Sequence, residues 1–273
     1  MHPENIRTNE TPTWCPGCFN FQVLAGVQQF LEEQFKKGKK KEEFAIVTGI
    51  GCHAKLFDYL DAPGINTLHG RVPPTCLGIK IAKPDLTVFG FSGDGDAYAE
   101  GLDHTIHAAR YNSDFKYIVH NNQVFALTLG EPTPVTEVGF KDLTKPFGVD
   151  VMPLNPIKIM LSAGATFVAR IYAEVAQVKM ILEEAKKHKG FAFIEIMQPC
   201  TVFHIDSSHK KRVYNLQQSG HEKKDLKAAM EKADEYDYNS KTSKIPLGIF
   251  YQTQRETFEE LKLKKIYKQN KTN

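Results

Sequence analysis

The amino-acid sequence predicts an α/β fold built on a doubly wound parallel sheet. Five short runs are rich in β-branched and aromatic apolar residues, and each is bounded by Gly, Pro, Asn or charged residues, as buried strands are. Longer stretches with the apolar spacing of helices lie between these runs. Strands that alternate with helices form parallel sheets, and the ligands of such sheets bind at the carboxyl ends of the strands.

The expected elements follow one another along the first 200 residues or so. We expect strands at residues 44–51, 65–70, 86–93, 115–122 and 191–197. We expect helices at residues 19–37, 98–111 and about 168–188, the last because its apolar residues fall on one helical face. After Ile205 the composition becomes polar and charged. The sequence therefore predicts one α/β domain over residues 1–205 and an extension over 206–273 that packs on the same domain or on a partner.

The composition argues against several classes of function. The chain has 273 residues, of which 41% are hydrophobic, so it can bury a full core. A net charge of only +3 predicts no nucleic-acid partner. No apolar run approaches the roughly 18 residues of a membrane helix, so we expect no membrane partner and a cytoplasmic protein. Five cysteines in so long a chain do not form a disulfide scaffold, which favours metal binding or catalysis for clustered thiols.

A carboxylate and a carboxamide follow two of the expected strands. Asp94 stands between two glycines after the strand 86–93, and Asn122 ends the strand 115–122. Because parallel strands end at the same edge of a sheet, we expect the two side chains to meet there. Both offer oxygen ligands suited to Mg²⁺, and the glycines and the next helix let the backbone approach a diphosphate. The spacing predicts a magnesium–diphosphate clamp.

The same two elements match the thiamine diphosphate motif, in which GDG is followed at this distance by NN. In proteins with this motif, the aspartate and the last asparagine bind the metal through their side chains. The residue two positions further on binds it through its carbonyl group. The resemblance assigns these roles to Asp94, Asn122 and Val124.

Four of the five cysteines form a second set of candidate ligands. Cys15 and Cys18 have C-x₂-C spacing, Cys52 follows the first expected strand, and Cys200 follows the last. Four thiolates suit either a tetrahedral zinc site or an iron–sulfur cluster. Cys52 and Cys200 fall at the same sheet edge as the clamp. A structural zinc ion has no need to lie there, whereas an electron acceptor for an intermediate bound to thiamine needs to lie close to it. The fifth, Cys76, is interpreted as a small buried residue.

Five segments of the chain carry a family resemblance: TWCPGC, GIGCHAK, LHGRVPPTCLGIKIAKPDL, GDGDAYAEGLDHTIHAARYN and NNQVFALT. They resemble the β subunits of 2-oxoacid:ferredoxin oxidoreductases, a family that includes pyruvate and 2-oxoglutarate synthases. The resemblance covers residues 12–205, with a weaker match over residues 245–252. It implies that residues 1–205 form a thiamine-diphosphate-binding domain that also carries cluster ligands.

The resemblance assigns roles to individual residues. It makes Cys15, Cys18, Cys52 and Cys200 the ligands of one 4Fe–4S cluster. It places the thiamine diphosphate against Ile50, Gly51, Cys52, His53, His69, Gly95, Asp96, Ala126 and Leu127. Lys55 occupies the lysine of the family's GIGCxxK segment, near the substrate end, and is the candidate catalytic residue.

The implied reaction is the oxidative decarboxylation of a 2-oxoacid of the pyruvate or 2-oxoglutarate class, with coenzyme A, to acyl-CoA and CO₂. Electrons pass from thiamine diphosphate through the cluster to ferredoxin. In the family, the glutamate that activates the aminopyrimidine comes from a domain of the α chain, so we expect activity only with an α subunit. Two alternatives remain open: a non-redox thiamine diphosphate decarboxylase or carboligase with a zinc or vestigial cysteine site, and a non-catalytic subunit.

One segment departs from the family pattern. The family typically reads TGGQxSPT where this chain reads TLGEPTPVT, so that Leu129, Glu131 and Thr133 replace a glycine, a glutamine and a serine. This segment borders the cofactor and the substrate. The departure therefore bears on substrate preference rather than on the metal clamp.

Overall fold

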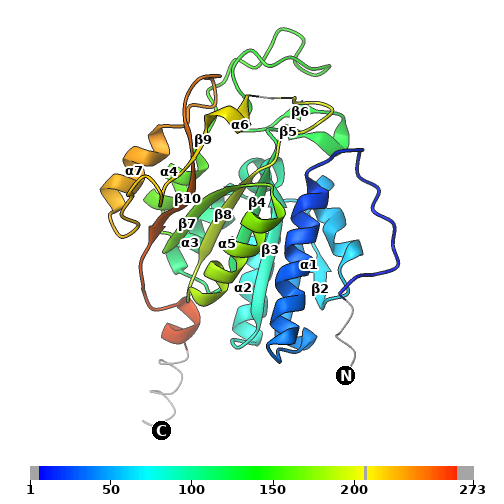
Figure 1. Cartoon of the computed structure of the whole chain (residues 1–273), viewed down its shortest axis with the longest axis vertical. Coiled ribbons are helices and arrows are strands. Elements are labelled where there is room, and N and C mark those ends of the chain that lie inside the picture. Colours follow the sequence, from blue (N-terminus) through cyan, green and yellow to red (C-terminus); the bar gives the residue numbers. More distant parts are fainter. Residues whose placement is uncertain (1–5, 206–207, 263–273) are drawn as a thin grey trace.

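Eight strands form one sheet in the order β2-β1-β3-β4-β8-β7-β10-β9 (Figure 1). The structure is a computed structural model that describes residues 6–205 and 208–262. All neighbouring strands of the sheet are parallel except β10 and β7. The predicted doubly wound parallel sheet is confirmed, with β10 as an unexpected antiparallel addition. Its strands are β1 (Phe44–Thr48), β2 (Gly64–Asn66), β3 (Thr87–Gly93), β4 (Lys116–Asn121), β7 (Phe167–Tyr172), β8 (Ala192–Met197), β9 (Val213–Asn215) and β10 (Ile245–Gln252).

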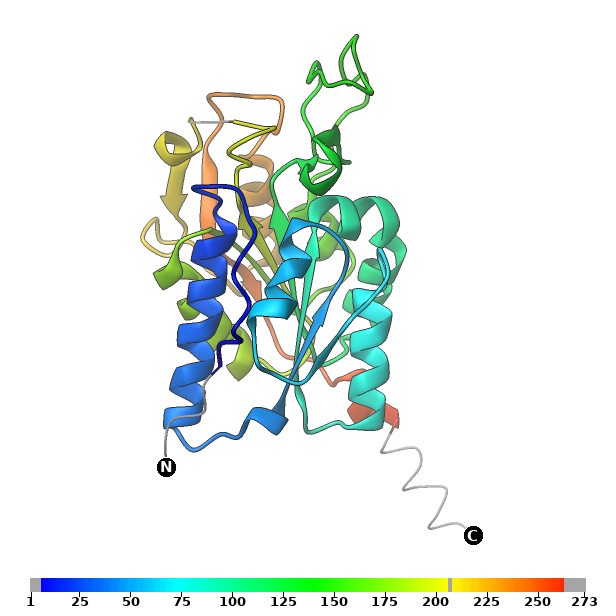
Figure 2. The ribbon, with the colours of Figure 1, turned by 90° about the vertical axis from the view of Figure 1, so that its right-hand side faces the viewer.

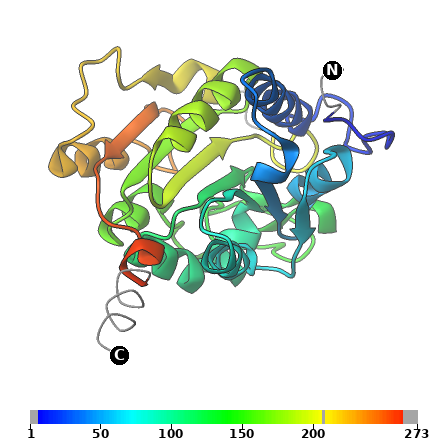
Figure 3. The same cartoon turned by 90° about the horizontal axis from the view of Figure 1, so that it is seen from below.

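Helices cover both faces of the sheet (Figure 3). Helices α1 (Asn20–Lys36) and α5 (Val175–Lys187) lie on one face, where Phe89, Phe91 and Ile118 of the central strands join their core. The other face carries α2 (Val72–Ala82), α3 (Leu102–Tyr111), α4 (Pro156–Ser162) and α7 (Leu226–Asp234). Because successive side chains of a strand point to opposite faces, and both faces are covered, the central strands are apolar almost throughout. No described helix is long and apolar enough to cross a bilayer.

The helix predicted at about 168–188 is wrong in its first third. Residues Phe167–Tyr172 form β7, a strand that is buried along its whole length, and α5 begins only at Val175. A strand that is buried on both faces has no period of its own, so Val168 and Ile171 match a helical stripe by coincidence. Strand β10 is a further element that the sequence analysis does not predict. Of the predicted C-terminal extension, residues 208–262 are described, and the boundary at residue 205 stays a prediction.

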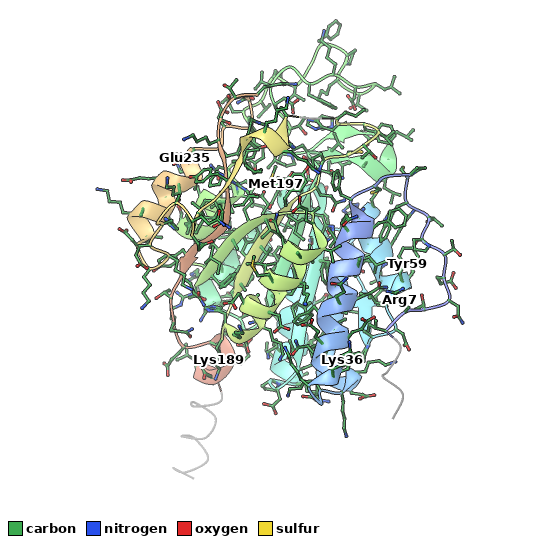
Figure 4. The ribbon with its side chains drawn as sticks, in the orientation of Figure 1. Arg7, Lys36, Tyr59, Lys189, Met197 and Glu235 are labelled. Carbon is green, nitrogen blue, oxygen red and sulfur yellow. The ribbon has the colours of Figure 1, made fainter. Side chains whose placement is uncertain are left out.

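The carboxyl ends of the central strands share one edge of the sheet. Met197, the last residue of β8, marks this edge, whereas Lys36 and Lys189 lie at the opposite end of the molecule (Figure 4). The chain between β6 (Glu131–Pro132) and α4 rises beyond the same edge (Figure 2). β6 pairs with β5 (Val124–Phe125) in a small antiparallel ribbon that lies outside the main sheet. This edge receives most of the residues to which the sequence assigns chemistry.

A buried ion pair joins two strands near that edge. Arg170 on β7 donates from Nε to Glu195 Oε2 on β8 at 2.7 Å, and both side chains are fully buried. The other carboxylate oxygen, Oε1, accepts hydrogen bonds from Asn121 Nδ2 at 2.8 Å and from the Tyr238 hydroxyl at 3.1 Å. The guanidinium group also lies 5.0 Å from the ring centroid of Tyr236. Tyr236 and Tyr238 belong to the polar C-terminal part of the chain. They complete a network of contacts around Arg170 and Glu195 that includes Asn121, the neighbour of Asn122.

We expect Arg170→Met to lower the free energy of unfolding by about 3–5 kcal/mol, because it leaves the charge of Glu195 buried without a partner. The matched control is Lys187→Met, which breaks the exposed Lys187–Glu184 pair on α5 and should change little. Urea denaturation of both variants, followed by circular dichroism, measures the difference. Equal effects of the two substitutions would contradict a structural role for the buried pair.

Candidate functional site

A cavity of about 60 Å³ opens at the carboxyl edge of the sheet, beside the ends of β1, β3 and β4. All nine residues that the resemblance places against thiamine diphosphate line it, as do Asp94, Asn122 and Val124. The structure therefore brings together side chains spread over nearly 80 residues of sequence, as expected for parallel strands that end at one edge. The cavity residues that the sequence analysis missed are Gly93, His120, Phe125, Thr128 and Gln198.

Asp94 is the buried acid of this cavity. Its Oδ2 accepts a hydrogen bond from the Thr133 hydroxyl at 2.6 Å, and its Oδ1 accepts one from the Asn122 N–H at 3.3 Å. Burial raises the pKa of Asp94 to about 7, and these two hydrogen bonds act in the opposite direction. None of the described groups that most affect this pKa carries a positive charge. A buried carboxyl group without a cation is suited to bind a divalent ion, which would supply the missing charge.

A tight turn after β4 presents the two other candidate metal ligands. Asn122 Oδ1 accepts a hydrogen bond from the Val124 N–H at 3.0 Å, which fixes the amide beside the chain that follows it. Between them Gln123 has φ +62°, an uncommon conformation for a residue other than glycine. The Gln123 side chain is buried and donates to the Val135 carbonyl at 3.0 Å. Buried hydrogen bonds therefore hold this backbone conformation in place.

Gly95 allows an aromatic ring to approach the turn after β3. A Cβ atom at this position would lie 2.2 Å from the ring of Phe125. No other residue fits there without displacing the ring, which itself lines the cavity. The backbone of Gly95 is helical (φ −63°), so it is the packing of the cavity wall, not the turn, that favours glycine after Asp94.

Asp96 ties two walls of the cavity together. Its Oδ1 accepts a hydrogen bond from the Gly70 N–H at 2.7 Å and lies 3.2 Å from His69 Nδ1. Its Oδ2 lies 3.7 Å from His53 Nε2. Burial raises the pKa of Asp96 and lowers that of His53. These contacts hold the segments after β1 and β2 against the turn after β3.

The four predicted thiol ligands gather beside the cavity. Cys52 lines it, and burial is the main cause that raises the pKa of the Cys52 thiol, to about 11. The thiols of Cys18, Cys200 and Cys15 raise this pKa further because they lie near enough to repel a negative sulfur. Cys76 lies apart from them, fully buried in α2. Three segments far apart in the sequence thus contribute four neighbouring thiols.

Two of these sulfurs accept hydrogen bonds. Asn20 Nδ2 lies 3.6 Å from Cys18 Sγ, and the Phe203 N–H donates to Cys200 Sγ at 3.3 Å. Among the described residues, no three His, Cys, Asp or Glu side chains are arranged to hold a single metal ion. The oxygen donors at the Asp94 site suit Mg²⁺, and four thiols suit either a zinc ion or an iron–sulfur cluster.

The remaining candidates lie outside the cavity wall. Lys55 Nζ donates to the Thr13 hydroxyl at 3.1 Å, and its charge acts to lower the pKa of Cys52. It does not line the cavity. Among the described residues that do, there is no glutamate, and Glu131, from the segment that departs from the family pattern, does not reach it. The missed residue His120 is buried, and burial lowers its pKa to about 4.

Comparison with known proteins places this arrangement in context. Residues 49–196 match the family described as "Thiamine pyrophosphate enzyme, C-terminal TPP binding domain". Residues 207–266 match the family of the C-terminal region of the pyruvate ferredoxin oxidoreductase β chain. The first match contains the whole cavity wall except Gln198. The second covers the segment that contributes β9, α7 and β10.

Individual proteins are similar over most of the chain. The 2-oxoacid:ferredoxin oxidoreductase subunit beta of Saccharolobus solfataricus is 38% identical over 90% of this chain and 84% of its own length. The 2-oxoglutarate synthase subunit KorB of Archaeoglobus fulgidus is 38% identical over 73% of this chain and 74% of its own. The solved 2-oxoglutarate:ferredoxin oxidoreductase of Magnetococcus marinus, with 2-oxoglutarate, coenzyme A and succinyl-CoA bound, superposes with a TM-score of 0.90. That similarity covers 98% of this chain and 90% of the other, at 32% identity.

Proposed function

Because this chain belongs to the β subunits of 2-oxoacid:ferredoxin oxidoreductases, we propose that it carries the cofactors for coenzyme A-dependent oxidative decarboxylation of a 2-oxoacid. The observation that supports this most directly is the cavity that Asp94 and Asn122 share with Cys52, one of four neighbouring thiols. A site for a metal-bound diphosphate and a site for an electron acceptor then adjoin. The bound 2-oxoglutarate of the Magnetococcus marinus enzyme supports a substrate of the pyruvate or 2-oxoglutarate class.

The residues of the cavity have separate roles in this proposal. Asp94, Asn122 and the Val124 carbonyl would hold Mg²⁺, and the metal would in turn hold the diphosphate. Thr133 orients the Asp94 carboxylate through its hydroxyl. When bound, thiamine diphosphate supplies the carbanion and the electron sink for decarboxylation.

The cysteines have the second role. Cys15, Cys18, Cys52 and Cys200 would hold a 4Fe–4S cluster, which when bound would supply the electron-transfer centre for ferredoxin. Because Cys52 also lines the cavity, the two cofactors share one wall. Lys55 contributes positive charge beside Cys52, toward the substrate end of the site. For this role, the Lys55 ammonium group either breaks its hydrogen bond to the Thr13 hydroxyl or acts through its charge from its present position.

The cavity is incomplete in this chain alone. Pockets that enclose a whole cofactor typically measure about 300–1,000 Å³, well above the 60 Å³ found here. Among the described residues no glutamate faces it that could activate an aminopyrimidine. We therefore propose that an α subunit packs over the cofactor and provides the missing glutamate.

The isolated chain, purified without oxygen, should bind thiamine diphosphate but reduce no viologen dye when given coenzyme A and a 2-oxoacid. Dye reduction should appear only when the α subunit is added. The assay should compare pyruvate, 2-oxoglutarate, branched-chain and aryl 2-oxoacids, with the α subunit alone as the control. Turnover by the contaminant-free chain would refute the need for a partner. Decarboxylation without dye reduction by the complex would instead favour a non-redox enzyme.

A further inference from the structure

Three buried polar side chains lie between the cavity and the cysteines. Asn20 begins α1 two residues after Cys18, His120 is on β4, and Gln198 follows β8 two residues before Cys200. All three are at most 3% exposed. His120 Nδ1 lies 3.2 Å from Asn20 Oδ1 and 2.8 Å from Gln198 Oε1. His120 and Gln198 also line the cavity.

The hydrogen bonds of this group determine one another. Amide oxygens only accept, so His120 Nδ1 carries the proton and donates to Asn20 Oδ1 and Gln198 Oε1. The other end of the Asn20 amide, Nδ2, then points to Cys18 Sγ, 3.6 Å away. If this amide turned over, its N–H groups would face the N–H of the imidazole, and Cys18 would lose its side-chain donor. His120 therefore holds Asn20 in the orientation that donates to sulfur.

We propose that Asn20 raises the reduction potential of a cluster bound at Cys18, and that His120 is the positioning residue for its amide. This inference rests on the proposed function. Reduction adds negative charge to a cluster and to its sulfur ligands, so an N–H group that donates to a ligand sulfur stabilises the reduced state. Cys200 receives a comparable bond from the Phe203 backbone, which no side-chain substitution removes. Cys18 also has a backbone donor, the Asn20 N–H, so its side-chain donor is the one that the sequence can adjust.

The test measures the midpoint potential of the anaerobically purified full-length chain by a redox titration followed by electron paramagnetic resonance. Asn20→Leu keeps the shape of the side chain and removes its donor, so the potential should become more negative. His120→Phe leaves Asn20 in place but removes the group that orients it, so a smaller shift in the same direction is expected. Adding His120→Phe to Asn20→Leu should cause no further shift, because both act through one bond.

A matched control comes from the same helix. Gln34 is also buried on α1, but its amide donates to Glu183 Oε1 at 2.6 Å, near the end of α1 that lies away from Cys18. Gln34→Leu should leave the potential unchanged. An Asn20→Leu chain with full iron content and the wild-type potential would overturn the inference, as would an equal shift in the Gln34 variant.

Two further results separate this inference from the proposed function. If Asn20→Leu loses its iron, His120→Phe still decides the matter, because all four cysteines and Asn20 remain, and an unshifted potential there overturns the positioning role. A wild-type chain that binds no iron or sulfide would instead overturn the proposed function. The inference would then fall with it.

Discussion

Asp94→Ala should weaken the binding of thiamine diphosphate with Mg²⁺ at least about 100-fold, more than the loss expected for an outer-shell residue. The other proposed ligands are an amide oxygen and a carbonyl oxygen, so Asp94 is the only negative group among the three proposed ligands. The fold should survive. Burial is the main cause that opposes the charge of this carboxyl group, the negative charge of Glu195 adds to it, and no cation among the described residues offsets them. Asp94→Asn, which keeps the shape of the side chain, should bind equally poorly.

The single tryptophan of the chain provides the readout. Trp14 Nε1 donates to the Cys52 carbonyl at 2.7 Å, and Cys52 lines the cavity, so tryptophan fluorescence should respond when the cofactor binds. The matched control is Asp103→Ala, which removes an exposed carboxylate on α3. Native affinity in the Asp94 variants, with Mg²⁺ still required, would show that the metal binds elsewhere.

Replacing any one of Cys15, Cys18, Cys52 or Cys200 with serine should deplete iron and acid-labile sulfide together. A cluster with four thiolate ligands is bound less stably when one of them is lost, and these four thiols lie near enough for their charges to interact. Iron and sulfide analysis of the anaerobic protein measures the loss. Cys18→Ser also removes the sulfur to which Asn20 donates, and Cys200→Ser removes the one to which Phe203 donates.

Cys76→Ser is the control for this series, because it changes the same atom outside the cluster region. Cys76 is on α2, and its thiol is fully buried in the core between α2 and the sheet. We expect the variant to lose some stability but to keep its iron and sulfide. Equal iron loss in the Cys76 variant would contradict the four-ligand set, and a colourless wild-type chain containing zinc would favour the non-redox alternative.

The sequence predicts the position of the site better than its interior. Asp94 and Asn122 can be placed together because parallel strands end at one edge, a rule that needs only the strands and their order along the chain. His120 and Gln198 carry no such signal. Each is one polar residue within an apolar strand or directly after one, and its partners lie some 80–100 residues away. Only the tertiary structure shows that they meet.

The errors in the fold have a similar cause. The sequence of β7 reads as the start of a helix because a strand buried on both faces has no alternation to reveal it. β10 is hard to predict because it follows a long polar segment and runs antiparallel to β7 in an otherwise parallel region. In the sequence, Thr133 is notable only as a departure from the family pattern. The structure adds the reason it bears on the site, a hydrogen bond from its hydroxyl to Asp94.

The place of β10 has a consequence during synthesis of the chain. β7 pairs with β8 on one side and with β10 on the other, and all six of its residues are buried. β10 leaves the ribosome roughly 70 residues after β7, a delay of several seconds at about 5–20 residues per second. Throughout that interval the nascent chain carries an apolar strand with one open hydrogen-bonding edge, which is a template for aggregation. Pairing of β10 with β7 then closes this edge, so the polar C-terminal part protects completed chains from pairing with one another there.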